Sequence, residues 1–299
     1  MERLVIGSRG SALALAQVRM VREALSRVHP GLAVELKIIT TSGDRRQEVS
    51  AGEGNAAGLK GLFTKEIQDA LLDGSIDAAV HSLKDLPGVT PDALAIAAVL
   101  PRADTSDMLI SSRAELPPAA RIGTGSVRRG RQLRWLLPEA EVVEIRGNVP
   151  TRLQKLTTIP LDAIVLARAG LERLGYKVAD GRLEGDAGSF FARKIDVLPA
   201  IGQGAVGIET RVGDSAAALL ARIDHGPTHA CIRVERELLR LLNGDCRLPV
   251  GAHATLDGAG LIHAQAIVFH DAAPPSHARA SGDACDPERI ARRLFEQLS

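Results

Sequence analysis

Two stretches, RIGTGSVRR at residues 121–129 and VEIRGNVPTR at residues 143–152, decide how this chain folds. Each passes from a short apolar run through small, turn-permissive residues into an amphipathic helical pattern. Ser126 and Asn148 are expected helix N-caps, and Pro150 suits a first helical turn. Both stretches therefore predict a strand that leads through a tight turn into a helix.

Each of these turns is also expected to bind an anion. A helix N-terminus presents unpaired N–H groups and a partial positive charge, and four arginines add guanidinium groups that can grip carboxylates or phosphates: Arg128, Arg129, Arg146 and Arg152. Arg128 and Arg129 fall in a first helical turn, where the helix dipole disfavours cations, which indicates a compensating ligand. The alternative is that such arginines are solvated charges, which is our interpretation of Arg131 and Arg134.

The composition limits the kind of protein this is. A length of 299 residues allows two or three domains, and 45% hydrophobic with 24% charged residues is typical of a globular protein. A net charge of +1 and only 2% aromatic residues disfavour a nucleic-acid binder. We find no apolar run long enough to span a membrane and no signal-peptide pattern at the start, so a cytoplasmic location is expected.

Strands and helices alternate along the first part of the chain. Strands are expected over residues 4–7, 34–38 and 76–80, and helices over 11–28 and 64–73. The pattern restarts near residues 101–105, which suggests a hinge, and continues with strands over 141–146 and 162–167 and helices over 149–157 and 168–174. Such alternation predicts parallel sheets with helices on their faces.

The remaining segments are less regular. The Gly-rich, charged stretch 42–61 predicts a long mobile loop, and the Gly-bounded segment 198–209 predicts a strand. A third unit is expected to start near residue 215, with a helix over 228–242, alternating strands within 250–270 and a final helix capped by Asp286.

Lys84 and Asp85 follow directly after a predicted buried strand. In open α/β sheets, ligands bind at the carboxyl ends of the strands. A carboxylate in that position can act as a general acid and base when its pKa matches the task. The alternative is a surface ion pair beside the turn that leads to Pro87.

Cys246 is the cysteine most suited to chemistry. It lies on a Gly-bearing loop beside Arg247, which would favour the thiolate form and so a nucleophile or covalent attachment point. An inert loop thiol is the alternative. Cys231 fits ordinary packing within a helix, and Cys285 lies in a polar segment without supporting context. None of the three has metal-ligand spacing, so no metal site is expected.

Seven motifs taken in order resemble the porphobilinogen deaminase family, also called hydroxymethylbilane synthases. They are GSRGSALAL (7–15), KGLFTKE (60–66), HSLKDLP (81–87), GTGSVRR (123–129), IRGNV (145–149), GQGAVGIE (202–209) and the loop around Cys246. The resemblance covers residues 4 to about 251. Each motif is moderately specific, whereas the ordered set is very specific.

The resemblance implies an α/β fold of three domains. Two would resemble type-II periplasmic binding protein lobes flanking a cleft, residues 1–99 with 199–215 and residues 103–196, and a smaller α+β domain would span 217–299. The implied activity is a transferase reaction of tetrapyrrole (porphyrin, heme) biosynthesis. Four porphobilinogen molecules would be condensed head-to-tail into hydroxymethylbilane with release of ammonia. The enzyme would be a cytoplasmic monomer that binds porphobilinogen and oligopyrrole intermediates but no nucleic acid or membrane.

The resemblance also implies roles for particular residues. A dipyrromethane cofactor would be linked through a thioether to Cys246 and prime the chain. Asp85 would assist loss of the amine, stabilise the cationic electrophile and help to deprotonate the ring. Pyrrole acetate and propionate groups would be bound by Arg9, Ser11, Ser82, Lys84, Thr124, Ser126, Arg128, Arg129, Arg146, Asn148, Arg152 and Arg173. A mobile cover would end at Lys60 and Phe63.

One departure and one rival remain. The family usually has Gly-Gly-Cys followed by an uncharged residue, whereas this chain has Asp245 before Cys246 and Arg247 after it. A negative charge beside the thiol would slow cofactor attachment. The rival hypothesis is a non-enzymatic, two-lobed anion-binding or sensor protein with an inert Cys246. It explains the hinge and the basic turns but not the combination of Lys84, Asp85 and a lone loop cysteine.

Overall fold

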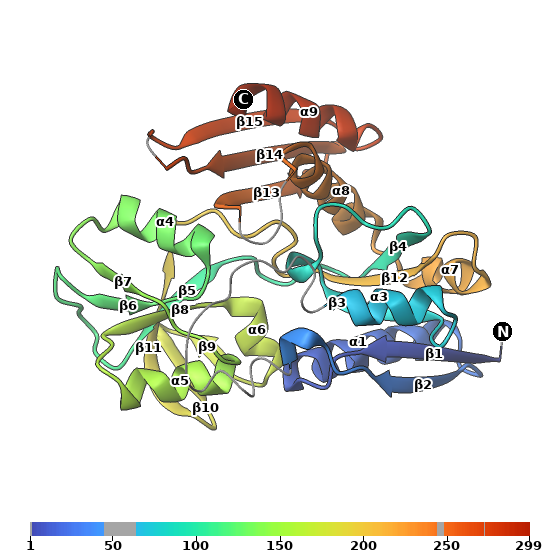
Figure 1. Cartoon of the computed structure of the whole chain (residues 1–299), viewed down its shortest axis with the longest axis horizontal. Helices are drawn as coiled ribbons and strands as arrows, with labels where there is room; N and C mark the ends of the chain where they lie inside the picture. Colours follow the sequence, from blue (N-terminus) through green and yellow to red (C-terminus); the bar gives the residue numbers. More distant parts are fainter. Residues whose placement is uncertain (1, 45–63, 244–247, 272) are drawn as a thin grey trace.

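The structure, a computed structural model, describes residues 2–44, 64–243, 248–271 and 273–299. Its described strands form three sheets, one in each of two side-by-side lobes and one in a C-terminal unit that lies above them in Figure 1. The chain passes from the first lobe to the second, returns to the first, and then enters the C-terminal unit. The observed class is therefore α/β with a separate small α+β region, as expected.

The first lobe is built around a five-stranded sheet of order β2-β1-β3-β12-β4. β1 pairs in parallel with β2 and β3, whereas β12 runs antiparallel to β3 and β4. The strands are β1 (Arg3–Ser8), β2 (Ala33–Ile38), β3 (Ala78–Ser82), β4 (Leu94–Val99) and β12 (Val206–Arg211), and the helices packed on them include α1 (Ala12–Val28), α3 (Lys65–Leu72) and α7 (Ser215–Leu220).

The second lobe repeats this plan in a seven-stranded sheet of order β7-β6-β8-β5-β11-β10-β9. β6 pairs in parallel with β7 and β8, and β5 is antiparallel to β8 and β11. The elements are β5 (Asp107–Ser111), β6 (Arg121–Gly123), α4 (Val127–Leu136), β7 (Glu141–Val143), α5 (Val149–Thr158), β8 (Ala163–Ala167), α6 (Arg168–Arg173), β9 (Lys177–Ala179), β10 (Arg182–Gly185) and β11 (Gly188–Ile195).

The C-terminal unit packs two helices on a three-stranded antiparallel sheet of order β13-β14-β15. Its elements are α8 (Gly226–Leu241), β13 (Val250–Leu256), β14 (Leu261–Val268), β15 (Ser276–Asp283) and α9 (Pro287–Leu298). Val234, Leu238, Ile262, Ile290 and Leu294 belong to its apolar core, and each is at most 1% exposed. α7 lies outside this unit, because Ala216 and Leu220 are buried in the core of the first lobe.

Two segments cross between the lobes. The outbound segment follows β4 and contains residues 101–105, where a hinge is expected, and the return segment precedes β12. The two are joined where Ala103 N donates to Gly204 O at 3.1 Å. The predicted strand over 198–209 is wrong in its first half, because Gly202 and Gly204 adopt φ of +71° and +82° and residues 201–204 form turns. The strand begins only at Val206.

The two arginine-bearing turns fold as predicted at their helix starts. Ser126 Oγ accepts a hydrogen bond from Arg129 N at 3.4 Å and caps α4, and Asn148 Oδ1 accepts one from Thr151 N at 3.0 Å and caps α5. Pro150 stands in the first turn of α5. The strand expected over 141–146 is shorter and ends at Val143.

Candidate functional site

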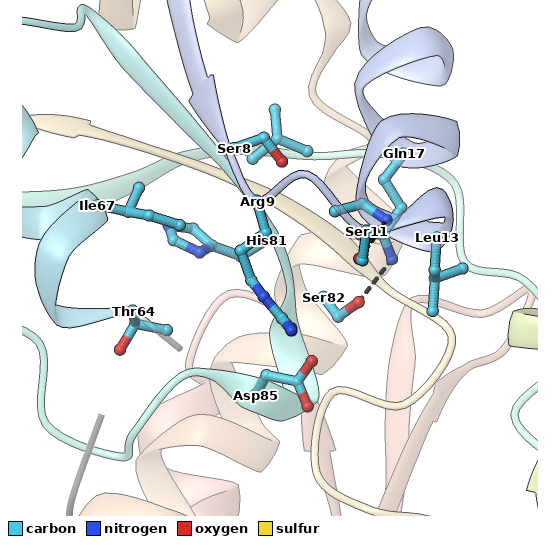
Figure 2. A pocket seen from close by; sticks show the side chains of 12 residues that line it. Ser8, Arg9, Ser11, Leu13, Gln17, Thr64, Ile67, His81, Ser82 and Asp85 are labelled. Atoms are coloured by element: carbon cyan, nitrogen blue, oxygen red, sulfur yellow. Dashed lines mark hydrogen bonds between the residues drawn. The ribbon is translucent and has the colours of Figure 1, made fainter. Parts of the chain in front are cut away.

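The first wall of the site lies at the carboxyl ends of β1 and β3. A pocket there is lined by residues that include Arg9, Ser11, Ser82, His81 and Asp85. In Figure 2 the side chains of Arg9 and Asp85 extend into this pocket, whereas the Ser82 hydroxyl points toward Gln17. Parallel strands direct these residues to one edge of the sheet, as the position of Lys84 and Asp85 predicted.

Asp85 is placed by a short 3₁₀ turn, Leu83–Asp85, that directly follows β3. Leu83 is 1% exposed and anchors the turn in the apolar core, whereas the Asp85 side chain is exposed and Lys84 is half-buried. Leu83 N also donates to Ala205 O at 3.1 Å, which ties the turn to the return segment. The fold therefore holds the backbone of the turn and leaves the carboxylate accessible.

The other polar residues of this wall are already engaged within the chain. Ser82 Oγ accepts a hydrogen bond from Gln17 Nε2 at 2.6 Å, and Ser11 caps α1. Arg9 grips Asp44, with Nε and Nη2 at 3.0 and 2.5 Å from Oδ1. Of these residues, Ser82 has its hydroxyl oriented by a neighbour on α1, which suits a group that positions a ligand.

The second wall is organised by a carboxylate that the sequence analysis missed. Asp107, at the start of β5, lies 2.7 Å from both Arg128 Nη2 and Arg129 Nη2, and its side chain is 0% exposed. Burial by itself would raise the pKa of Asp107, but the charges of Arg129 and Arg128 outweigh it and hold that pKa well below its usual range. The Asp107 carboxylate thus compensates the charges of Arg128 and Arg129 in the first turn of their helix. From the sequence, a ligand is expected in that role.

The two walls face one another closely enough for their charges to interact. Burial lowers the pKa of Lys84 to about 8, with Asp85 opposing this shift and Arg129 adding to it. Burial also lowers the pKa of Arg152, as does the charge of Arg129, while Asp85 raises it. Lys84 and Asp85 of the first lobe therefore share one electrostatic environment with Arg129 and Arg152 of the second.

Three arginines each have one buried hydrogen-bond donor without a partner among the described residues. Within the described part of the chain, the buried Nε atoms of Arg128, Arg129 and Arg173 have no hydrogen-bond partner. A buried donor without a partner is costly, and a bound carboxylate would satisfy it. These donors therefore fit a ligand that carries several carboxylates, such as an oligopyrrole.

Other predicted residues lie in less central positions. Arg146 is exposed and bridges to Glu144 at 2.7 Å, and Asn148 is exposed while capping α5. Thr124 is buried and its Oγ1 accepts from Ser126 N at 3.2 Å. Arg173 Nη2 donates to Gly204 O at 2.6 Å in the return segment.

Three predicted residues lie outside the described residues: Lys60, Phe63 and Cys246. The other two cysteines are free, and they differ. Cys231 is buried in α8, where burial raises the pKa of its thiol to about 11, with Glu235 adding to the shift; this confirms its assignment to packing. Cys285 is exposed.

Sequence reasoning did not single out Asp107, which organises the arginine pair. A signal for it exists, because it opens the buried strand DMLIS, and a charge in a buried strand needs a partner. Gln203 lies in the GQGAVGIE motif, but nothing in the motif indicates its contact with Asp107, which depends on where the two segments that join the lobes meet. In the described ranges, no helix is long and apolar enough to cross a membrane, and no three His, Cys, Asp or Glu side chains gather as metal ligands.

Comparisons with known proteins agree with the sequence motifs. One family model, porphobilinogen deaminase, dipyromethane cofactor binding domain, matches residues 4–218, and a second, porphobilinogen deaminase, C-terminal domain, matches residues 229–298. The chain is 44% identical to the porphobilinogen deaminase of Moorella thermoacetica over 100% of its own length and 93% of the relative's. It is 41% identical to that of Syntrophobacter fumaroxidans over 98% and 93% of the two lengths.

Solved structures give a weaker likeness. The methionine binding protein MetQ superposes with a TM-score of 0.43 and 14% identity, over 74% of this chain and 88% of that one. An ancestral cationic amino acid solute binding protein gives a TM-score of 0.44 and 14% identity, over 74% and 87%.

Proposed function

The chain belongs to the porphobilinogen deaminase family, and we propose that its cleft condenses four porphobilinogen molecules into hydroxymethylbilane, consuming one water and releasing four ammonia molecules. The observation that carries the proposal is that Asp85, with Lys84 beside it in the first lobe, shares one electrostatic environment with Arg129 and Arg152 of the second lobe. The Asp85 carboxylate, which can stabilise a cationic reaction centre, thus lies near cations that can bind a polyanionic pyrrole chain.

The cations bind the substrate through its carboxylates. Each pyrrole ring carries an acetate and a propionate, so every added ring brings two negative charges. The unpartnered Nε groups of Arg128, Arg129 and Arg173 are donors for these groups, and Arg152 and Lys84 add charge from the two sides of the cleft. Arg9, Arg146, Ser11, Ser82, Thr124, Ser126 and Asn148 complete the proposed binding set.

A dipyrromethane cofactor, attached by a thioether to Cys246, supplies when bound the terminal pyrrole that accepts each new ring. The family model that matches residues 4–218 carries the name of this cofactor's binding domain. The buried, unpartnered donors described above suit its four carboxylates. Lys60 and Phe63 are proposed to end a cover over the cleft.

Asp85 acts on the incoming porphobilinogen. Loss of the amine of porphobilinogen as ammonia leaves a cationic carbon–nitrogen system, and the nearby Asp85 carboxylate stabilises that charge. After the new carbon–carbon bond forms, the attacked ring carbon must lose a proton, and the Asp85 carboxylate is the base for this step. The same carboxylate therefore first stabilises the positive charge of the incoming ring and then accepts the proton that the accepting ring loses.

The pH dependence of substrate capture is expected to follow Lys84. Its pKa is lowered to about 8, so the amine is charged below that pH and neutral above it. The kcat/KM for porphobilinogen, which reports the free enzyme, is expected to fall as pH rises through about 8. Lys84→Arg keeps a charge at every accessible pH and should move this decline upward. An unshifted decline in Lys84→Arg would assign it to another group.

A direct assay tests the proposed function. The purified protein is incubated with porphobilinogen, and the ammonia released and the hydroxymethylbilane formed are both measured. One ammonia per porphobilinogen consumed and one linear tetrapyrrole per four is the expected stoichiometry. Binding of porphobilinogen without ammonia release would favour the anion-binding sensor.

The remaining features of the proposal concern organisation. We propose three domains, residues 1–99 with 199–215, 103–196 and 217–299; the three sheets support this division, although α7 packs on the first lobe. We also propose a cytoplasmic monomer that binds no nucleic acid or membrane. The net charge of +1 and the scarcity of aromatic residues support the absence of nucleic-acid binding.

A further inference from the structure

The turn Ile201–Gly204 lies where the two segments that join the lobes meet. We propose that Gln203, in this turn, is a positioning residue that holds the arginine pair of the second lobe in register with the Lys84–Asp85 turn of the first. The inference rests on the proposed function and extends it to a residue that touches neither substrate nor cofactor.

The side chain of Gln203 reaches into the second lobe. Its Nε2 donates to Asp107 Oδ1 at 2.8 Å and to Thr105 O at 2.7 Å. Both partners can only accept, so the amide nitrogen must face them. Asp107 Oδ1 is the same oxygen that binds Arg129, and Oδ2 binds Arg128. Gln203 therefore fixes a carboxylate that, together with the carbonyls of Leu198 and Val165, sets the direction of the two guanidinium groups.

The amide is retained at a cost. Gln203 is 1% exposed, and among the described residues its Oε1 is buried without a hydrogen-bond partner. An apolar side chain of similar length would avoid this unpaired acceptor. The two bonds from Nε2 are what the glutamine gains in exchange, which points to them as the reason for a polar residue in this position.

The backbone of the turn Ile201–Gly204 packs against the turn Leu83–Asp85 of the first lobe. Gly202 packs so closely that a Cβ on it would lie 2.9 Å from the Leu83 carbonyl carbon and 3.1 Å from Lys84 N. Leu83 N donates to Ala205 O at 3.1 Å, just after the turn. Displacement of the turn would thus disturb the segment that carries Asp85.

The turn is also held from the C-terminal unit. Arg102 Nε donates to Gln203 O at 2.9 Å, and the two Nη atoms of Arg102 bind Glu235 of α8 at 2.6 and 3.0 Å. Glu235 Oε2 accepts from Gly202 N at 2.8 Å. Arg102 and Glu235 thus hold the backbone of the turn. The side chain of Gln203, which starts from this fixed backbone, holds Asp107 in a defined position beside the arginines.

The proposal predicts a specific kinetic defect. Gln203→Met keeps the approximate length of the side chain and removes both hydrogen bonds from Nε2, so Asp107 loses its bond to the turn, whereas Arg128 Nη1 keeps its bond to Leu198 O in the return segment. The KM for porphobilinogen is expected to rise about tenfold, the factor of one charge-assisted hydrogen bond. The kcat should change less than about threefold, because Asp85 is untouched, and the covalent cofactor should remain in the intact mass.

A matched control separates positioning from stability. Thr228 is buried, and its Oγ1 accepts a hydrogen bond from Arg102 N at 3.2 Å. Thr228→Val therefore removes a bond to the outbound segment and leaves the contacts of Asp107 unchanged. It should lower Tm as Gln203→Met does and leave KM unchanged. Gln203→Asn, which is too short to reach both acceptors, replaces the methionine variant if that fails to fold, with the same expected rise in KM.

The outcomes are distinct. A Gln203 variant that loses Tm but keeps the KM of the wild type overturns the proposal, since a merely structural residue behaves that way. A higher KM in the Gln203 variant than in the Thr228 variant, at matched Tm, supports the proposal. A wild-type protein without turnover and without a covalent pyrrole group contradicts the proposed function itself, which is a different result from an active wild type with an unaffected Gln203 variant.

Discussion

Asp85→Ala is expected to lower kcat by about a hundred- to a thousandfold, because removing a preorganised charge at a developing ionic centre typically has an effect of this size. The Asp85 side chain is exposed, and its backbone is anchored by the buried Leu83, so Tm should stay nearly unchanged. Steady-state kinetics with porphobilinogen, together with a thermal melt, measure both quantities.

The control for this prediction is another exposed aspartate of the same lobe. Asp92→Ala removes a carboxylate outside the pocket described in Figure 2 and should retain normal turnover. Asp85→Asn keeps the shape of the side chain without its charge and should be nearly as inactive as the alanine variant. Turnover within about threefold of the wild type in Asp85→Asn would remove the carboxylate from the mechanism.

Cys246→Ala is expected to abolish both the covalent pyrrole group and turnover. The other two cysteines are less suited to attachment: Cys231 is buried, which raises the pKa of its thiol to about 11, and the neighbouring Asp283 raises the pKa of Cys285. Cys285→Ala, which removes an exposed thiol, is the matched control and should keep the added mass and the activity. Activity in Cys246→Ala, or loss of the added mass in Cys285→Ala, would place the attachment point elsewhere.

Local sequence signals predicted much of the fold. The caps Ser126 and Asn148 and the proline of α5 were readable because capping depends on residues within one turn of each other. β15 was missed, since its sequence SHARASGD carries only small residues on its less exposed side (Ser276, Ala278, Ala280 and Gly282) and gives little apolar alternation. Its place in the sheet comes from pairing with β14 along eight residues.

The sequence drew attention to the arginines of the candidate site but not to the carboxylate that neutralises part of their charge. Arg128 and Arg129 were recognised as unusual in a first helical turn, and that conflict is real. Its resolution by Asp107, about twenty residues earlier in the chain, depends on β5 lying beside β8 in the sheet. Long-range pairing of this kind leaves no periodic trace in the sequence, and the same holds for Gln203.

The charge balance has a functional consequence. Asp107 neutralises one of its two arginines, so the pair keeps a net positive charge while its guanidinium groups are held in fixed directions. A fixed array binds carboxylates with less loss of side-chain entropy than flexible surface arginines do. The proposed site therefore combines two arginines held in fixed directions in the second lobe with the accessible carboxylate of Asp85 in the first.

The central claim is that this protein carries a covalent dipyrromethane on Cys246. The intact mass of the protein, purified from a host that makes porphobilinogen, tests it most directly. The wild-type protein is expected to be heavier than its sequence by two porphobilinogen molecules minus two ammonia molecules, and Cys246→Ala to have the bare mass. A wild-type protein with the mass of its unmodified sequence would show that no dipyrromethane is attached.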